Sequence, residues 1–217
     1  MFFQHWFWDF DGTLYDTYPL VVEDFAKALQ DAGLFADESR LLAQVKITLY
    51  GAARTYAKGD EVLAESLLDR YQHYAGMRTN EELRPYPLAG EMLRAVTQRG
   101  GRNYLYTHRD LSAVEALKHD QLWTAFSGQV TKEDGFPHKP RPDALLHLLD
   151  THGLDPAECC MVGDRDIDLD AAKNAGITPV LFDPDHFYDH YETPYRFSSY
   201  QDMLRALDAP RGGKHDI

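Results

Sequence analysis

The chain has 217 residues and is 44% hydrophobic, which is enough apolar material for one full-sized core or for a core domain with a small insertion. Its 35 acidic and 22 basic side chains give a formal net charge of −13, which argues against a nucleic-acid backbone or an anionic membrane as partner. No stretch approaches the ~20 apolar residues that a membrane-spanning helix needs.

Two features of the sequence favour a cytoplasmic location. Cys159 and Cys160 are adjacent in an apolar run, so they cannot join distant segments, and packing inside a strand suits them best. The N-terminal residues lack the basic segment and the small-residue cleavage site of a secretory signal. We therefore expect a soluble protein of the reducing cytoplasm.

The first predicted element is a buried strand over the aromatic run 2–8, which leads directly into Asp9-Phe10-Asp11-Gly12-Thr13-Leu14. Two carboxylates at the carboxyl end of a strand lie where open parallel sheets bind their ligands. In phosphoryl transfer, one carboxylate can attack phosphorus while the other handles protons at the leaving group. Their repulsion, about 4 kcal/mol at ~4 Å and an effective dielectric constant of ~20, implies a divalent cation. Taken alone, this motif has a second interpretation, in which Asp9 and Asp11 only cap a strand-to-helix turn.

The next block, residues 15–84, reads as a small helical bundle inserted after the first strand. A helix opens around Pro19 and ends at Gly33, and apolar residues at helical spacing continue over 38–77. No strand signal occurs in this block, and Pro85 marks the return to the main domain.

Strand and helix signals alternate through the rest of the chain. Strands are predicted at 103–107, 126–130, 159–162 and 179–182, and helices at 91–99, 112–119, 142–152, 169–175 and 200–207. Such units predict a parallel sheet with helices on both faces and a site at the carboxyl ends of the strands. We therefore expect an α/β protein with a Rossmann-like core of residues 1–14 and 85–210, a helical cap of residues 15–84, and a flexible tail of residues 211–217.

Three later segments carry polar residues of the kind that phosphoryl transfer uses. Thr107 ends the second predicted strand, where a hydroxyl and nearby backbone amides can bind a phosphate oxygen. Lys139 precedes a helix that opens with proline, and its charge can neutralise both phosphate and nucleophile. Carboxylates from Asp164 to Asp168 follow the fourth strand and can complete an oxygen-only shell for Mg²⁺.

Taken together, these motifs resemble those of the haloacid dehalogenase superfamily, close to its phosphoglycolate phosphatase and β-phosphoglucomutase group. The four matching motifs are Asp9-x-Asp11-Gly12-Thr13, Thr107, Lys139-Pro140 and Gly163-Asp164-x-x-x-Asp168. The resemblance spans residues 1 to about 207, and it identifies the helical insertion with the mobile cap of the family.

The resemblance implies a role for each matching residue. Asp9 would form an aspartyl-phosphate, Asp11 would act as general acid and then as base, and Thr107 and Lys139 would hold the phosphate. Asp9, the Asp11 carbonyl and Asp164 would ligate Mg²⁺, with Asp168 close behind. Gly12 and Thr13 would border the bound phosphate.

Several other residues have two interpretations. His108 and Arg109 can contact phosphate or substrate, or face solvent as ordinary loop residues. His186 and His190 have zinc-like spacing, but a surface loop is the favoured interpretation because no third ligand is placed beside them. Arg54 follows Gly51, which would let a cap loop turn toward the core and present Arg54 to the substrate. The alternative for Arg54 is a solvated helix arginine.

The leading hypothesis is a Mg²⁺-dependent hydrolase of a small phosphorylated metabolite, acting as a monomer or homodimer. A sugar phosphomutase is the alternative enzyme, since it would keep its phosphoenzyme until a second hydroxyl attacks. A non-enzymatic phosphate sensor is a further alternative, and the presence of all the principal catalytic positions argues against it. A dehalogenase is disfavoured because it needs neither Asp11 nor a metal shell. The sequence leaves the identity of the leaving group open.

Overall fold

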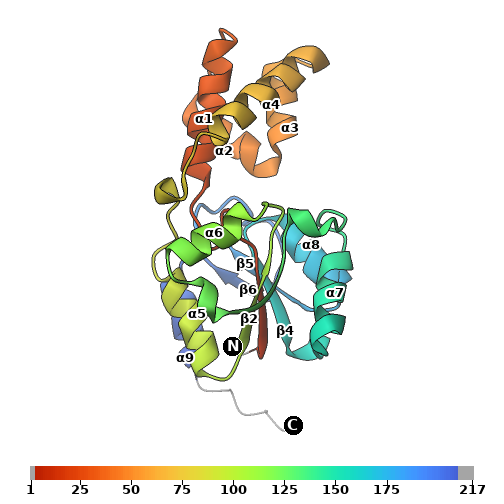
Figure 1. The fold of residues 1–217 in the computed structure, drawn as a ribbon. Helices are drawn as coiled ribbons and strands as arrows, with labels where there is room; N and C mark the ends of the chain where they lie inside the picture. The colour runs from red at the N-terminus through yellow and green to blue at the C-terminus, as the bar shows by residue number, and fades with distance from the viewer. Residues whose placement is uncertain (1–2, 210–217) are drawn as a thin grey trace. The chain divides into compact units, whose positions relative to one another are not determined.

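A computed structural model describes residues 3–209 of the chain (Figure 1). The chain divides into two compact units. The core unit comprises the residues up to Tyr15 and those from Pro85 onward, and the inserted unit comprises Asp16–Arg84. The predicted tail of residues 211–217 lies outside the described residues.

The core unit contains a parallel sheet of six strands in the order β3-β2-β1-β4-β5-β6. The strands are β1 His5–Trp8, β2 Arg102–Tyr106, β3 Phe126–Val130, β4 Cys159–Gly163, β5 Thr178–Phe182 and β6 Tyr195–Phe197. From β1 the chain builds outward through β2 to β3 and then crosses back to β4 on the other side of β1. This reversal creates a switch point at the carboxyl end of β1, which is where open α/β sheets bind ligands. The α/β prediction is confirmed.

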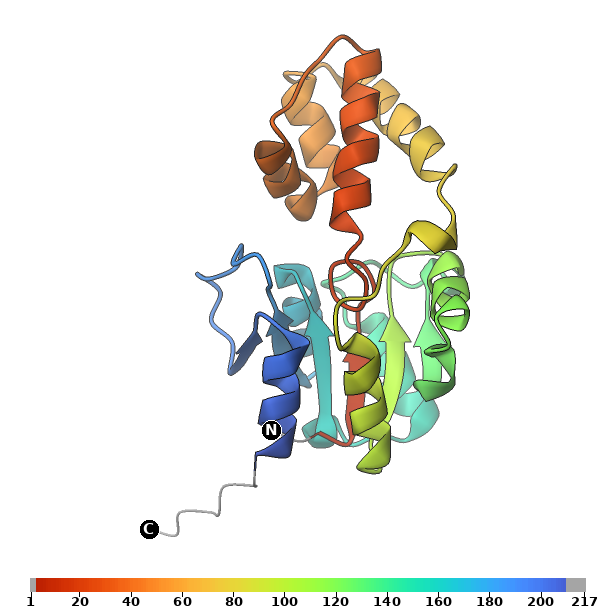
Figure 2. The ribbon, with the colours of Figure 1, turned by 90° about the vertical axis from the view of Figure 1, so that its left-hand side faces the viewer.

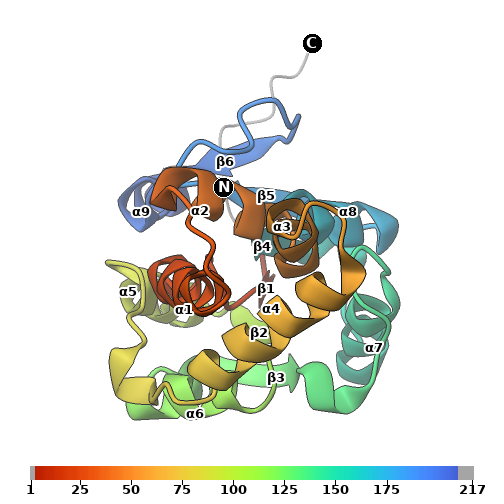
Figure 3. The same ribbon diagram turned by 90° about the horizontal axis from the view of Figure 1, so that it is seen from above.

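Helices cover both faces of the sheet (Figures 2 and 3). In Figure 2, α5 and α9 stand in front of the strands, and Figure 3 shows α7 and α8 on the opposite side. The helices of the core unit are α5 Ala89–Gln98, α6 Ser112–His119, α7 Asp143–His152, α8 Asp166–Asn174 and α9 Tyr200–Asp208.

Alternation along β1 explains how one short strand serves both faces. Phe7 is fully buried in the cluster that includes residues of α7 and α8. Trp6 and Trp8 point to the other face, where their rings stack with centroids 5.4 Å apart and Trp8 lies near Tyr200 of α9. The Trp8 indole also donates to Asn103 Oδ1 at 2.9 Å, which satisfies its buried N–H. The aromatic run thus forms the centre of the core.

The inserted unit is a bundle of α1 Tyr18–Asp31, α2 Glu38–Ile47, α3 Leu49–Tyr56 and α4 Glu61–Ala75. Helix α1 packs against α2 and α4, and α3 packs against the same two helices. The segment 38–77, predicted as helical, contains three separate helices. Each begins at its own N-cap, because the side chains of Asp37, Thr48 and Asp60 each accept a hydrogen bond from a backbone N–H. Among the described residues, no helix is long and apolar enough to cross a membrane.

Two elements differ from the sequence prediction. Strand β6 was not predicted, since it has only three half-buried residues and pairs at the edge of the sheet with β5 alone. Helix α8 begins at Asp166 rather than near Leu169, which places Asp168 in its first turn. There, Asp168 Oδ2 accepts a hydrogen bond from Arg165 N at 3.2 Å. This contact fixes the last carboxylate of the motif beside the end of β4.

Candidate active site

The turn after β1 holds Asp9 at the centre of the sheet edge. Asp9 N donates to Val162 O of β4 at 3.0 Å, so the ladder continues one residue beyond the strand. Gly12 has φ +73°, a conformation that favours glycine, and its N–H donates to Tyr15 O at 2.8 Å. The Tyr200 hydroxyl donates to Thr13 O at 2.9 Å and ties the turn to α9. The nucleophile candidate therefore stands on a closed, anchored turn.

Lys139 contacts three separate segments of the core unit: the turn after β1, the end of β2 and the first turn of α8. Its Nζ lies 2.7 Å from Asp9 Oδ1 and 2.8 Å from Asp168 Oδ1, and it donates to Tyr106 O at 3.0 Å. The side chains of Lys139, Asp9 and Asp168 are all almost wholly buried. Buried charges of this kind persist only when they are paired, so the cation and the two carboxylates depend on one another.

Burial and pairing act in opposite directions on these groups. Burial raises the pKa of Asp9 to about 6, although Lys139 pulls it downward. Burial alone would lower the pKa of Lys139, but Asp168 and Asp9 outweigh it and raise the pKa. For Asp168, burial is outweighed by Lys139 and Arg165, so the pKa falls below its ordinary value. Additional positive charge near Asp9 would favour its ionised, nucleophilic form.

Asp9, Asp164 and Asp168 form a buried acidic cluster whose ligand oxygens all lie within 4.8 Å of one another. Asp9 Oδ2 is buried, and within residues 3–209 it has no hydrogen-bond partner. An unsatisfied carboxylate oxygen costs free energy unless a ligand compensates it. An oxygen-only donor set suits a hard divalent cation, so these residues fit a metal site.

Gly163 allows the cluster to close. A Cβ at this position would lie 2.2 Å from the Cβ and 2.4 Å from the Cγ of Asp168, so no side chain fits. The glycine at the end of β4 is therefore required by the close approach of the Asp168 side chain.

The loop after β2 supplies Thr107, His108 and Arg109. Thr107 is buried, its backbone N donates to Val130 O, and its Oγ1 accepts from Arg109 N at 3.0 Å. The hydroxyl hydrogen can still be donated to a phosphate oxygen. The Arg109 guanidinium forms an ion pair with Asp11, with Nη2 2.6 Å from Oδ1.

His108 contacts the backbone of the lysine loop. Its Nε2 accepts from Lys139 N at 2.9 Å, so Nδ1 carries the proton of the neutral ring. Burial and the nearby Lys139 charge lower the pKa of His108 to about 3. A neutral His108 therefore joins the loops of Thr107 and Lys139, a role that no sequence pattern indicated.

This contact makes stability depend on pH. The folded protein binds the His108 proton less readily than the unfolded chain, whose ordinary pKa is 6.5, so stability is lost as pH falls from 6.5 toward 3. We expect His108→Gln, which keeps an acceptor but cannot titrate, to gain about 1–2 kcal/mol relative to wild type between pH 7 and pH 5, after allowing for solvent screening. Urea unfolding of both proteins in metal-free buffer measures the difference. Parallel pH profiles would contradict this account.

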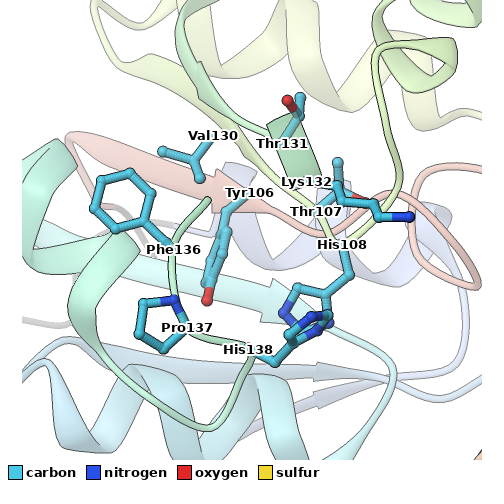
Figure 4. A pocket seen from close by; sticks show the side chains of 9 residues that line it. All are labelled: Tyr106, Thr107, His108, Val130, Thr131, Lys132, Phe136, Pro137 and His138. Carbon is cyan, nitrogen blue, oxygen red and sulfur yellow. The ribbon is translucent and has the colours of Figure 1, made fainter. Parts of the chain in front are cut away.

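A cavity of about 30 Å³ lies behind the loop after β2 (Figure 4). Figure 4 shows the rings of His108 and His138 close together at one end of it, and their centroids are 4.4 Å apart. The volume suits a water-sized occupant rather than a metabolite. Substrate binding is therefore not expected in this cavity.

Arg54 and His186 are two further candidates from the sequence. Arg54 lies in α3, not in a loop, and pairs with Glu61 at 2.8 Å with about half of its side chain exposed. Of the two interpretations of this segment, the helix is observed and the turn at Gly51 is not, because Thr48 caps α3 and its Oγ1 accepts from Gly51 N at 2.8 Å. His186 is exposed beside Asp189, and within residues 3–209 no metal-binding group of three or more side chains includes it.

Lys46 is a buried lysine that no sequence pattern marked as unusual. It is 1% exposed, and its Nζ lies 4.7 Å from the centre of the Tyr18 ring within the inserted unit. Lys46 is the last basic residue of α2, and a surface position would be expected for it.

Known proteins share both the sequence pattern and the fold. The chain is 31% identical over 181 residues to a phosphoglycolate phosphatase of Aliivibrio fischeri, covering 77% of this chain and 78% of the relative. It is 27% identical over 169 residues to the pyrophosphatase PpaX of Bacillus cereus, covering 77% of each.

Solved structures agree with the fold. A haloacid dehalogenase-like family hydrolase from Streptococcus pneumoniae superposes with a TM-score of 0.78 at 19% identity, covering 95% of this chain and 99% of that protein. Another hydrolase from Streptococcus pneumoniae gives 0.66 at 24% identity, covering 96% and 100%. The sequence model of the haloacid dehalogenase-like hydrolases matches residues 7–182, so this chain belongs to that family.

Proposed function

We propose that the chain is a Mg²⁺-dependent phosphatase that hydrolyses the phosphomonoester of a small metabolite. The observation that carries the proposal is the state of Asp9: Oδ1 is held by Lys139, and Oδ2 is buried without a partner among residues 3–209, beside Asp164 and Asp168. The similarity to enzymes named phosphoglycolate phosphatase and pyrophosphatase supports phosphoryl chemistry.

Each residue has a place in a two-step reaction. An Asp9 oxygen attacks phosphorus and forms an aspartyl-phosphate, while Asp11 gives a proton to the departing oxygen. Asp11 then takes a proton from water, which attacks phosphorus and restores the Asp9 carboxylate. Lys139 and Thr107 hold the phosphate oxygens that become more negative in the transition state.

The turn after β1 and the end of β4 would hold the ion. The ligands would be Asp9, the Asp11 carbonyl and Asp164, with Asp168 behind them, and Gly12 and Thr13 would border the phosphate. When bound, the ion supplies positive charge that neutralises the phosphate and the carboxylates. Among the substrate-binding candidates, Arg54 would act from the inserted unit, and His108 would act indirectly by holding Lys139.

We expect Mg²⁺ both to activate and to stabilise the protein. Buried carboxylates repel one another, so an ion that binds only the folded state adds about 2.7 kcal/mol at ~100 times its dissociation constant. Hydrolysis of p-nitrophenyl phosphate and the melting temperature, each measured in Mg²⁺ and in EDTA, test this directly. Ca²⁺, which is larger and takes more ligands, provides a control for ion identity.

The same assay separates the proposed phosphatase from its alternatives. If neither the melting temperature nor the rate of hydrolysis changes with Mg²⁺ or EDTA, the proposed metal site is wrong. Conversion of a sugar phosphate to its isomer, without release of phosphate, would indicate a phosphomutase instead. Binding of phosphate without any turnover would indicate a sensor.

A further inference from the structure

We propose that Arg109 selects substrates whose leaving group carries its own negative charge, a carboxylate or a second phosphate. The guanidinium would share its donors between Asp11 and that anion. This inference rests on the proposed phosphatase function, because Asp11 is there assigned to the leaving group. It assigns Arg109 a specificity role that neither the family motifs nor the metal site provides.

The first observation is the geometry of the ion pair between Arg109 and Asp11. Arg109 Nε lies 3.1 Å from both carboxylate oxygens of Asp11, and Nη2 lies 2.6 Å from Oδ1. Guanidinium groups bind planar anions through such paired contacts. Arg109 thus already binds a carboxylate at the position where the leaving group is expected.

The second observation is that the backbone of Arg109 is fixed at the phosphate site. Its N–H donates to Thr107 Oγ1, and its carbonyl accepts from Lys132 N, each at 3.0 Å. The guanidinium carbon lies 5.4 Å from the centre of the Phe10 ring, and Phe10 is the residue between Asp9 and Asp11. The positive charge is therefore held beside the reacting groups and is not free to swing into distant solvent.

The third observation is the contrast in exposure between two ion pairs of the site. The side chains of Arg109 and Asp11 are 28% and 32% exposed, whereas those of Lys139 and Asp9 are 0% and 3% exposed. Partly exposed ion pairs contribute little net stability, so a ligand can displace part of one at small cost. An anion in solution can reach the partly exposed Arg109. The ion pair of Lys139 and Asp9 is buried, so in the proposed mechanism it can contact only the phosphate that reacts.

Electrostatics then gives the direction of selection. An anionic leaving group would enter a site that already holds the carboxylates of Asp9, Asp164 and Asp168, and it would be repelled by them. Arg109 can remove that repulsion because its five N–H donors allow it to contact two anions together. A neutral leaving group gains nothing from this charge. We therefore expect the enzyme to favour the anionic substrate of any matched pair.

The test compares matched substrates in the full-length protein with Mg²⁺. 2-Phosphoglycolate and 2-hydroxyethyl phosphate have similar size and differ in the charge of the leaving group, and inorganic pyrophosphate supplies a phosphate in place of the carboxylate. Arg109→Gln should lower the ratio of kcat/KM for the anionic to the neutral substrate by roughly ten- to a hundredfold. Arg109→Lys, which keeps a point charge without the fork, should retain an intermediate ratio. A fall confined to phosphoglycolate or to pyrophosphate would identify which anion is bound.

Arg141→Gln is the matched control, because Arg141 is exposed on the next loop and pairs with Asp143. It removes the same charge and should leave the ratio unchanged. An equal loss on both substrates in Arg109→Gln, or a wild type that shows no preference for the anionic substrate, would overturn the inference. A wild type without activity on any of these phosphates would instead refute the proposed function. Since the ratio is taken within one variant, partial unfolding cannot imitate the expected result.

Discussion

Asp9→Asn is expected to abolish turnover, lowering kcat by several orders of magnitude while the fold survives. The amide has nearly the shape of the carboxylate but no anionic oxygen to attack phosphorus. The fold should tolerate the change because burial already disfavours the charged form of Asp9, and Lys139 keeps its contact with Asp168. Single-turnover release of phosphate measures the loss, and circular dichroism checks the fold.

A second measurement links the loss to the nucleophile. Beryllium fluoride with Mg²⁺ should raise the melting temperature of the wild type by mimicking aspartyl-phosphate, and should leave Asp9→Asn unaffected. Asp150→Asn, an exposed position on α7, makes the same chemical change away from the site and should keep full activity. Substantial turnover by Asp9→Asn would contradict the covalent mechanism.

Lys139→Met is expected to cost about 3–5 kcal/mol of unfolding free energy in metal-free buffer. Methionine fills a similar volume but leaves the buried carboxylates of Asp9 and Asp168 without their cation. Because a divalent ion can replace part of that charge, Mg²⁺ should stabilise the variant more than it stabilises the wild type. Urea unfolding with and without Mg²⁺ gives both quantities.

The double variant tests the origin of this effect. If repulsion between unpaired carboxylates causes the loss, adding Asp9→Asn to Lys139→Met should recover part of it, and the two changes should not be additive. Lys58→Met, at an exposed position of the inserted unit, should change stability by no more than about 0.5 kcal/mol. Simple additivity would show that lost packing, rather than charge, explains the result.

The grouping of the candidate site residues at one edge of the sheet could be predicted from the sequence, because these residues follow strands. Asp9, Thr107 and Asp164 are each the first residue after the end of β1, β2 or β4, respectively. These three strands are neighbours in a parallel sheet, so local signals in three separate segments are enough to predict one shared edge.

The contacts between loops could not be predicted in the same way. Arg109 and Asp11 are 98 positions apart, and His108 and Lys139 are 31 positions apart, so neither pair has a periodic signature. Which oxygen or nitrogen each side chain contacts depends on the path of two irregular segments. The two interpretations of the segment from Gly51 to Arg54 stayed open for a related reason: a glycine can end a helix or lie inside its first turn, and the N-cap contact of Thr48 distinguishes the two.

The junction between the two units has a consequence for how such enzymes diversify. The outgoing and returning chains are held together on both sides of the boundary: Tyr86 N donates to Leu14 O within the core unit, and Asp16 N donates to Arg84 O within the inserted unit, each at 2.9 Å. Tyr15 also bridges to Pro85. Because these contacts hold the two ends of the insertion next to each other, changes in the length or sequence of the inserted segment should have little effect on the stability of the sheet. Evolution can therefore exchange or enlarge this segment as a module while the chemistry at the strand ends is inherited unchanged.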